Sequence, residues 1–88
     1  MKTVMFYDLA PGGMEKAPLN FAAHRARLGE FHARGVLLMA GPLGHPPEGA
    51  LGIFTSREAA EEFVREDPFV LNGVVQNVRL VAWNEVLA

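Results

Sequence analysis

The pattern of hydrophobic and polar positions predicts a strand at the start of the chain and a helix after it. Residues 2–9 are rich in Val, Met, Phe and Tyr, and Ala10-Pro11-Gly12-Gly13 then interrupts the pattern, as expected of a strand that ends in a turn. From Pro18 the apolar positions follow a helical period, and proline is favoured in the first turn of a helix. Gly35 suits the left-handed residue that closes a helix, so we expect the helix to span residues 18–34.

Two short strands are predicted in the middle of the chain. Residues 36–40 form a continuous apolar run, which is typical of a buried strand, and Gly41-Pro42 should end it. Residues 44–49 consist mostly of the turn-forming residues glycine and proline. The apolar residues that follow predict a further strand over 51–55.

A second helix and a last strand are predicted in the remainder. Ser56 is a suitable N-cap, and Glu58 would lie near the positive end of the helix dipole of a helix that runs to about Glu66. Asp67-Pro68 then predicts one further helical turn, which should stop at Asn72-Gly73. The last strand is expected over residues 74–86.

The order of these elements, β-α-β-β-α-β, predicts the ferredoxin-like α+β fold. In this fold a four-stranded antiparallel sheet carries both helices on one face. We expect one domain over residues 1–88, because a chain of this length holds a single small core and no internal repeat or linker divides it.

Both faces of the predicted sheet are apolar. Val4 and Phe6 point to one face of the first strand. Met5 and Tyr7 point to the other. Two helices cover only one face, so we expect a second copy of the chain to cover the other, giving a homodimer in the form of a dimeric α+β barrel. The alternative is a monomer with a half-exposed apolar face.

Composition excludes several classes of function. The net charge is −2 with both signs interspersed, which argues against a nucleic-acid surface and against a polybasic membrane patch. The longest apolar run is too short to span a bilayer, and the N-terminus enters the first strand without a signal-peptide pattern. There is no cysteine to form a disulfide or bind a metal. These features predict a soluble, cytoplasmic protein.

His24 is the first candidate for chemistry. Its spacing from Phe21, Leu28 and Phe31 predicts that it lies on one apolar stripe of the helix, facing the core. A histidine in that position could simply donate and accept hydrogen bonds inside the core. It could also act as a general acid or base, if it has access to a cleft.

Asp67 is the second candidate, and it too has two interpretations. An aspartate directly before Pro68 is typical of a helix N-cap, and this explains the residue without any function. A carboxylate that contacts His24 would instead orient the imidazole to act as a general acid or base. Capping and catalysis are compatible, because a cap holds the carboxylate in place.

The other polar residues carry weaker signals. His32 lies about 80° around the helix from His24, and His45 lies in a Pro/Gly loop, so neither completes a metal-ligand spacing. The glycines form no phosphate-binding loop, and we expect no metal and no cofactor. Asp8, Asn77 and Arg79 are polar positions within strands that could line a cleft or a dimer rim.

The chain resembles the YciI-like family, whose members carry a YCII-related domain, over nearly its whole length. The resemblance rests on five segments in the same order: Ala23-His24-Arg25-Ala26-Arg27-Leu28, Gly35-Val36-Leu37-Leu38-Met39-Ala40-Gly41-Pro42-Leu43, Ser56-Arg57-Glu58-Ala59-Ala60, Asp67-Pro68-Phe69-Val70 and Val81-Ala82-Trp83. It implies a ferredoxin-like subunit, a homodimer and a site built on a His-Asp pair, roles that fall on His24 and Asp67. The wider family includes a dehydrochlorinase.

These observations lead to three hypotheses. The first is a cofactor-independent lyase or isomerase that moves a proton on a small molecule, with His24 as base and Asp67 orienting it, and with Tyr7, Pro68 and Phe69 contacting the substrate. The second is a non-catalytic module that binds a small ligand or has a regulatory role. The third is a dimeric scaffold, in which His24 is a core residue and Asp67 a cap.

Overall fold

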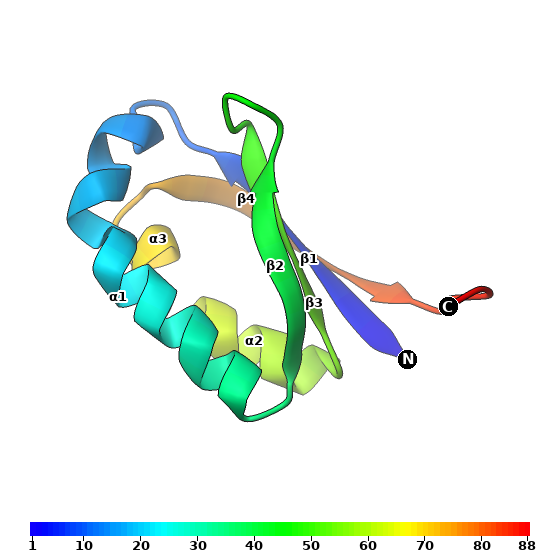
Figure 1. The fold of residues 1–88 in the computed structure, drawn as a ribbon. Coiled ribbons are helices and arrows are strands. Elements are labelled where there is room, and N and C mark those ends of the chain that lie inside the picture. Colours follow the sequence, from blue (N-terminus) through cyan, green and yellow to red (C-terminus); the bar gives the residue numbers. More distant parts are fainter.

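Four antiparallel strands form one sheet in the order β2-β3-β1-β4, and the helices cover one of its faces (Figure 1). The computed structural model describes all 88 residues. The elements are β1 (Lys2–Leu9), α1 (Gly13–Ala33), β2 (Leu37–Leu43), β3 (Gly49–Phe54), α2 (Arg57–Arg65), α3 (Pro68–Leu71) and β4 (Val75–Trp83). The predicted ferredoxin-like α+β subunit is therefore confirmed.

Helix α1 begins at Gly13, so the expectation that it starts at Pro18 is wrong. Gly12 precedes the helix in the left-handed conformation, with φ of 73°, which glycine adopts without strain. A Cβ atom on Gly13 would lie 2.1 Å from the carbonyl oxygen of Val74, the residue before β4, so the two backbones pass too closely for a side chain at Gly13. This contact sets the start of α1, and Pro18 consequently lies inside the helix.

Strand β2 continues through Gly41 and Pro42 to Leu43, where the sequence predicted an end after residue 40. It is an edge strand, and an edge tolerates proline because one side of its backbone has no strand to bond. The expectation that this run is buried also fails within the single chain. Leu37 is 3% exposed, whereas Met39 is 65% exposed.

The core lies between the sheet and the helices. Its centre is Phe63 of α2, which packs edge-on against Phe31 of α1 and at a tilt against Phe54 of β3. The other buried hydrophobic residues are Met5, Tyr7, Leu37, Ala59, Ala60, Val74 and Val75.

The buried stripe of α1 differs from the predicted one at Phe21. His24 and Phe31 are buried as expected, and Leu28 packs against the core. Phe21 is 55% exposed, so its predicted place in the core is wrong. The stripe instead continues from His24 to Ala17, about 40° around the helix from Phe21, because packing against α3 and β2 sets the rotation of α1.

Candidate functional site

Asp67 lies between α2 and α3 and has no exposed surface. It is the N-cap of α3, and its Oδ1 accepts a hydrogen bond from the backbone N–H of Phe69 at 3.2 Å. Pro68 follows as the first helical residue and is partly buried. The predicted cap is therefore present. It holds the carboxylate beneath α1, with the rest of its hydrogen-bonding capacity free for other partners.

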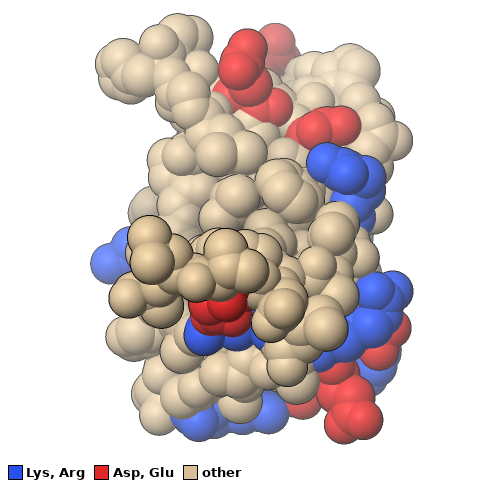
Figure 2. All heavy atoms as spheres, turned by 90° about the vertical axis from the view of Figure 1, so that its right-hand side faces the viewer, with Lys and Arg blue, Asp and Glu red and all other residues tan.

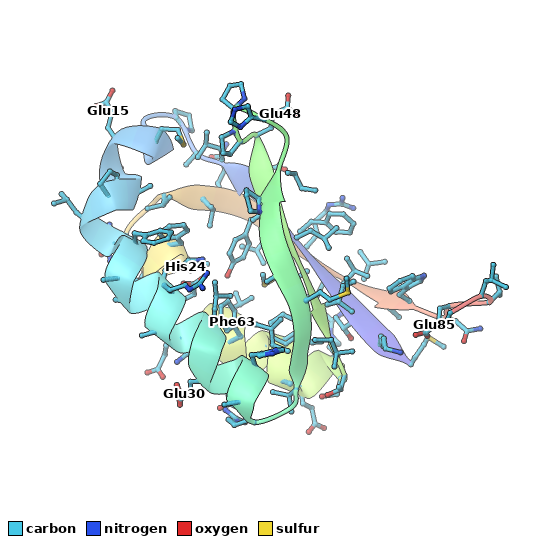
Figure 3. All side chains as sticks on the ribbon, viewed as in Figure 1. Glu15, His24, Glu30, Glu48, Phe63 and Glu85 are labelled. Carbon is cyan, nitrogen blue, oxygen red and sulfur yellow. The ribbon has the colours of Figure 1, made fainter.

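His24 is the partner that α1 brings to this carboxylate. Its Nδ1 lies 2.7 Å from Oδ1 of Asp67, across 43 residues of sequence. A carboxylate oxygen accepts, so this contact places the hydrogen on Nδ1. The ring of Phe69 stacks on the imidazole at 3.8 Å and nearly parallel to it. Figure 3 shows His24 pointing from α1 into the space between this helix and the sheet.

Tyr7 of β1 completes the cluster from the opposite side. Its hydroxyl donates to Oδ2 of Asp67 at 2.6 Å, and its side chain is buried at 1% exposure. Burial, followed by the negative charge of Asp67 and the hydrogen bond to it, raises the pKa of Tyr7 well above its ordinary value. The phenol therefore stays protonated and acts as a donor. Its contact in the structure is with Asp67, beneath the imidazole.

The Nε2 atom of His24 is the one polar atom of this cluster that the chain leaves without a partner. No hydrogen bond reaches it, and every fully buried side-chain nitrogen or oxygen in the protein has a partner. Nε2 must therefore reach the surface, although His24 as a whole is only 9% exposed. With Nδ1–H directed at Asp67, the neutral ring carries its lone pair on this accessible nitrogen.

The other polar residues singled out in the sequence lie elsewhere. Asn77 of β4 donates to Asp8 of β1 at 3.3 Å, and the guanidinium of Arg79 lies 4.7 Å from the ring centre of Phe6. Arg79 thus covers part of the open sheet face. His45 is exposed in the β2–β3 loop, as predicted. His32 is exposed at the end of α1 and bonds to the backbone of Leu37.

The sequence located His24 and Asp67 but missed the hydrogen bond from Tyr7. The signal available was that Tyr7 shares a strand face with the buried Met5, and a tyrosine hydroxyl inside a core needs a polar partner. The chain brings together no group of three histidine, cysteine or acidic side chains that could hold a metal ion. None of its helices combines the length and apolar character that a membrane crossing requires.

Comparisons with known proteins agree with this architecture. No curated protein matched the sequence. Among solved structures, the chain is similar to 5-chloro-2-hydroxyhydroquinone dehydrochlorinase from Burkholderia phenoliruptrix AC1100, solved in complex with 2,5-dihydroxybenzoquinone. The TM-score is 0.78 at 23% identity, covering 96% of this chain and 94% of that chain, which supports the shared fold. The model of the YCII-related domain matches residues 1–84, and the chain therefore belongs to the YCII-related family.

Proposed function

We propose that this protein is a cofactor-independent proton-transfer enzyme, a lyase or isomerase acting on a small cyclic or enolisable compound. The observation that carries the proposal is a histidine whose Nδ1 is held by a fully buried carboxylate while its Nε2 remains accessible. That arrangement is the one a general base requires, because the carboxylate orients the ring and stabilises the imidazolium that forms. The fold shared with a dehydrochlorinase is consistent with this chemistry.

The proposed reaction balances without a cofactor. Nε2 of His24 takes a proton from a carbon or hydroxyl of the substrate, and the released electron pair forms a new double bond. In an elimination, a leaving group such as chloride departs with its bonding electrons, and the imidazolium then releases the proton to water. In an isomerisation, the imidazolium returns the proton to another atom of the substrate. The lone pair of Nε2 lies in the plane of the imidazole, so the substrate must approach along the ring edge that carries Nε2, while Phe69 covers one face of the ring.

His24→Ala should lower turnover by about 10²–10⁴-fold, the usual contribution of a general base. Two assays measure this loss: chloride release from 5-chloro-2-hydroxyhydroquinone, and deuterium uptake from heavy water by enolisable ring compounds. His45→Ala is the matched control, because His45 is exposed in the β2–β3 loop, away from Asp67. Full activity in His24→Ala would reject the proposal. Saturable binding of these compounds with neither reaction in the wild type would favour the non-catalytic binding module.

We further propose that the protein works as a homodimer. The face of the sheet opposite the helices carries an entirely apolar hollow, formed by Val4, Phe6, Leu51, Ile53, Val81, Ala82 and Trp83. Figure 2 shows this side of the molecule, where uncharged atoms occupy most of the middle and charged side chains gather mainly toward the rim and the lower part. An apolar sheet face of this kind suits a second copy packed sheet against sheet.

Ile53→Glu should convert the dimer to a monomer, because it places a charge in the centre of the apolar hollow, where dimerisation would bury it without a partner. Sedimentation velocity measures the change in mass. Ala22→Glu, on the exposed side of α1, adds the same charge away from the hollow and should leave the dimer intact. A wild-type protein that sediments as a monomer at high concentration would refute the homodimer.

A further inference from the structure

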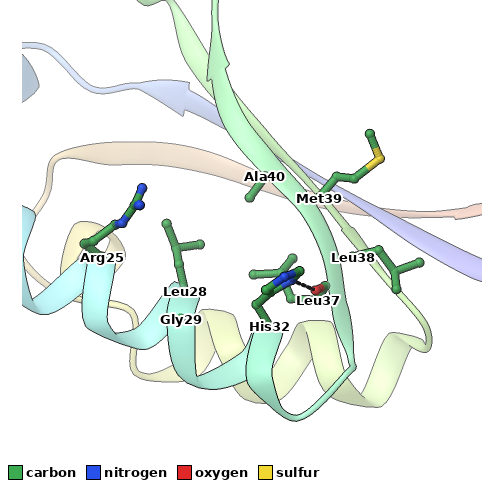
Figure 4. A pocket seen from close by; sticks show the side chains of 8 residues that line it. All are labelled: Arg25, Leu28, Gly29, His32, Leu37, Leu38, Met39 and Ala40. Carbon is green, nitrogen blue, oxygen red and sulfur yellow. Dashed lines mark hydrogen bonds between the residues drawn. The ribbon is translucent and has the colours of Figure 1, made fainter.

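A groove of about 270 Å³ lies between α1 and the edge strand β2, outside the His24–Asp67 cluster (Figure 4). None of the residues of that cluster lines it. The helix contributes one wall and the exposed strand the other. Its lining residues include Arg25, Leu28, Gly29 and His32 of α1 and Leu37 and Ala40 of β2.

Gly29 is the feature that first suggests an occupant. Glycine inside a helix is unfavourable relative to alanine, and Gly29 lies well within the 21 residues of α1. A Cβ atom at this position would meet no atom of the chain within 4 Å, and its φ is not left-handed. Neither packing within the chain nor backbone conformation requires a glycine here. What its missing side chain provides is space in the groove.

The polar groups of the groove are placed at two ends of the helical wall. Arg25 forms no ion pair or hydrogen bond within the chain, so its guanidinium is available to an anion. His32 uses Nδ1 to donate to the carbonyl oxygen of Leu37 at 2.9 Å, which leaves Nε2 of the neutral ring as an acceptor. The two residues are seven apart, or about 10 Å along the helix axis. Leu28 lies between them (Figure 4).

We propose that this groove binds a single aromatic ring that carries an anionic group at one end and a hydroxyl at the other, as in 4-hydroxybenzoate. Arg25 would bind the carboxylate, because a guanidinium matches its two oxygens. Nε2 of His32 would accept the hydroxyl hydrogen. The ring would lie over Gly29, between Leu28 of α1 and Ala40 of β2, whose side chain points toward the helix (Figure 4). This binding does not depend on the proton transfer proposed for His24.

The test is a titration of the protein with 4-hydroxybenzoate, in which NMR spectra monitor the backbone amide chemical shifts. We expect the largest shifts at Gly29 and Ala40, and binding at least about tenfold tighter than that of the uncharged 4-hydroxybenzamide. Arg25→Gln should remove this preference for the anion, whereas Arg65→Gln, on α2 outside the groove, should keep it. Gly29→Leu should abolish binding by filling the groove, and Gly29→Ala, which adds only a methyl group, should retain it.

Several outcomes would overturn the proposal. Equal affinity for the acid and the amide would show that Arg25 recognises no anion, and shifts confined to the open sheet face would place the probe elsewhere. If the probe does not bind and Gly29→Leu lowers the mass in sedimentation, the groove holds a second copy instead. Should Gly29→Leu fail to fold, Arg25→Gln still decides the result. His24→Ala should keep probe binding, which separates this test from the test of catalysis.

Discussion

Replacing Asp67 with alanine should lower the free energy of unfolding by about 3–5 kcal/mol, a large share of the stability of a small domain. The carboxylate accepts three hydrogen bonds in a site without solvent, from Tyr7, His24 and the backbone of Phe69. Its removal leaves these donors buried without an acceptor, and each unsatisfied group costs about 1–3 kcal/mol. Urea unfolding at neutral pH measures the loss.

Asp67→Asn separates stability from chemistry at the same position. The amide oxygen can still accept from His24, and the amide nitrogen can donate to the hydroxyl of Tyr7, so the stability loss should be less than half that of the alanine variant. The negative charge that would stabilise an imidazolium is gone, so activity should fall in both variants. Asp8→Ala is the matched control, because Asp8 is exposed and bonds only to Asn77. A loss below about 1 kcal/mol in Asp67→Ala would contradict the hydrogen-bonded cluster of Asp67, Tyr7 and His24.

At alkaline pH the wild type should lose stability that Tyr7→Phe does not lose. The folded chain raises the pKa of Tyr7 above its ordinary value of 10.0, through burial first and the Asp67 carboxylate second. Above that pH the unfolded chain releases the phenolic proton while the folded chain keeps it. The unfolded state then binds fewer protons, so stability falls as pH rises, by about 1.4 kcal/mol per pH unit. Below the unfolded pKa this contribution is fully present.

Tyr7 is the only tyrosine in the chain, so its ionisation can be observed directly. We expect tyrosinate absorbance to appear only as the protein unfolds. The fluorescence of the single tryptophan monitors unfolding in parallel. Urea unfolding of wild type and Tyr7→Phe between pH 8 and 11 gives the difference in slope, and other titrating groups cancel between the two proteins. At neutral pH the free energy of unfolding of Tyr7→Phe should be about 1.5–3 kcal/mol lower than that of the wild type, which is the contribution of a hydrogen bond to a charged group. Ionisation of Tyr7 in the folded protein would refute its buried contact with Asp67.

The local signals along the chain were sufficient to predict most of the secondary structure. Ser56 caps α2 through a bond from the N–H of Ala59, and Asp67 caps α3, as their side chains predicted. Residues 2–9 were predicted as β1 without error, because their Val, Phe and Tyr residues favour a strand and the turn-forming residues from Pro11 onward end it. The order of the elements was then enough to predict the ferredoxin-like sheet.

Boundaries that depend on distant residues were predicted poorly. The start of α1 is set by the close approach of Gly13 to Val74, which lies across the fold. The end of β2 depends on its place at the sheet edge, where Pro42 is tolerated beside Ala50 of β3. Phe21 is exposed because packing against neighbouring elements sets the rotation of α1 about its axis. The helical period alone does not determine which residues at the edge of the apolar stripe are buried.

For the candidate site, the sequence by itself determined that His24 lies on the inner side of a helix and that Asp67 caps a helical turn. Both follow from patterns within a few residues. Only the tertiary structure decided that they meet, that Tyr7 bonds the same carboxylate, and that Nε2 of His24 stays accessible. The physical reason is that hydrogen bonds between side chains depend on how separate elements pack, and packing is set by the whole core, whereas caps and periodicity are set by neighbouring residues.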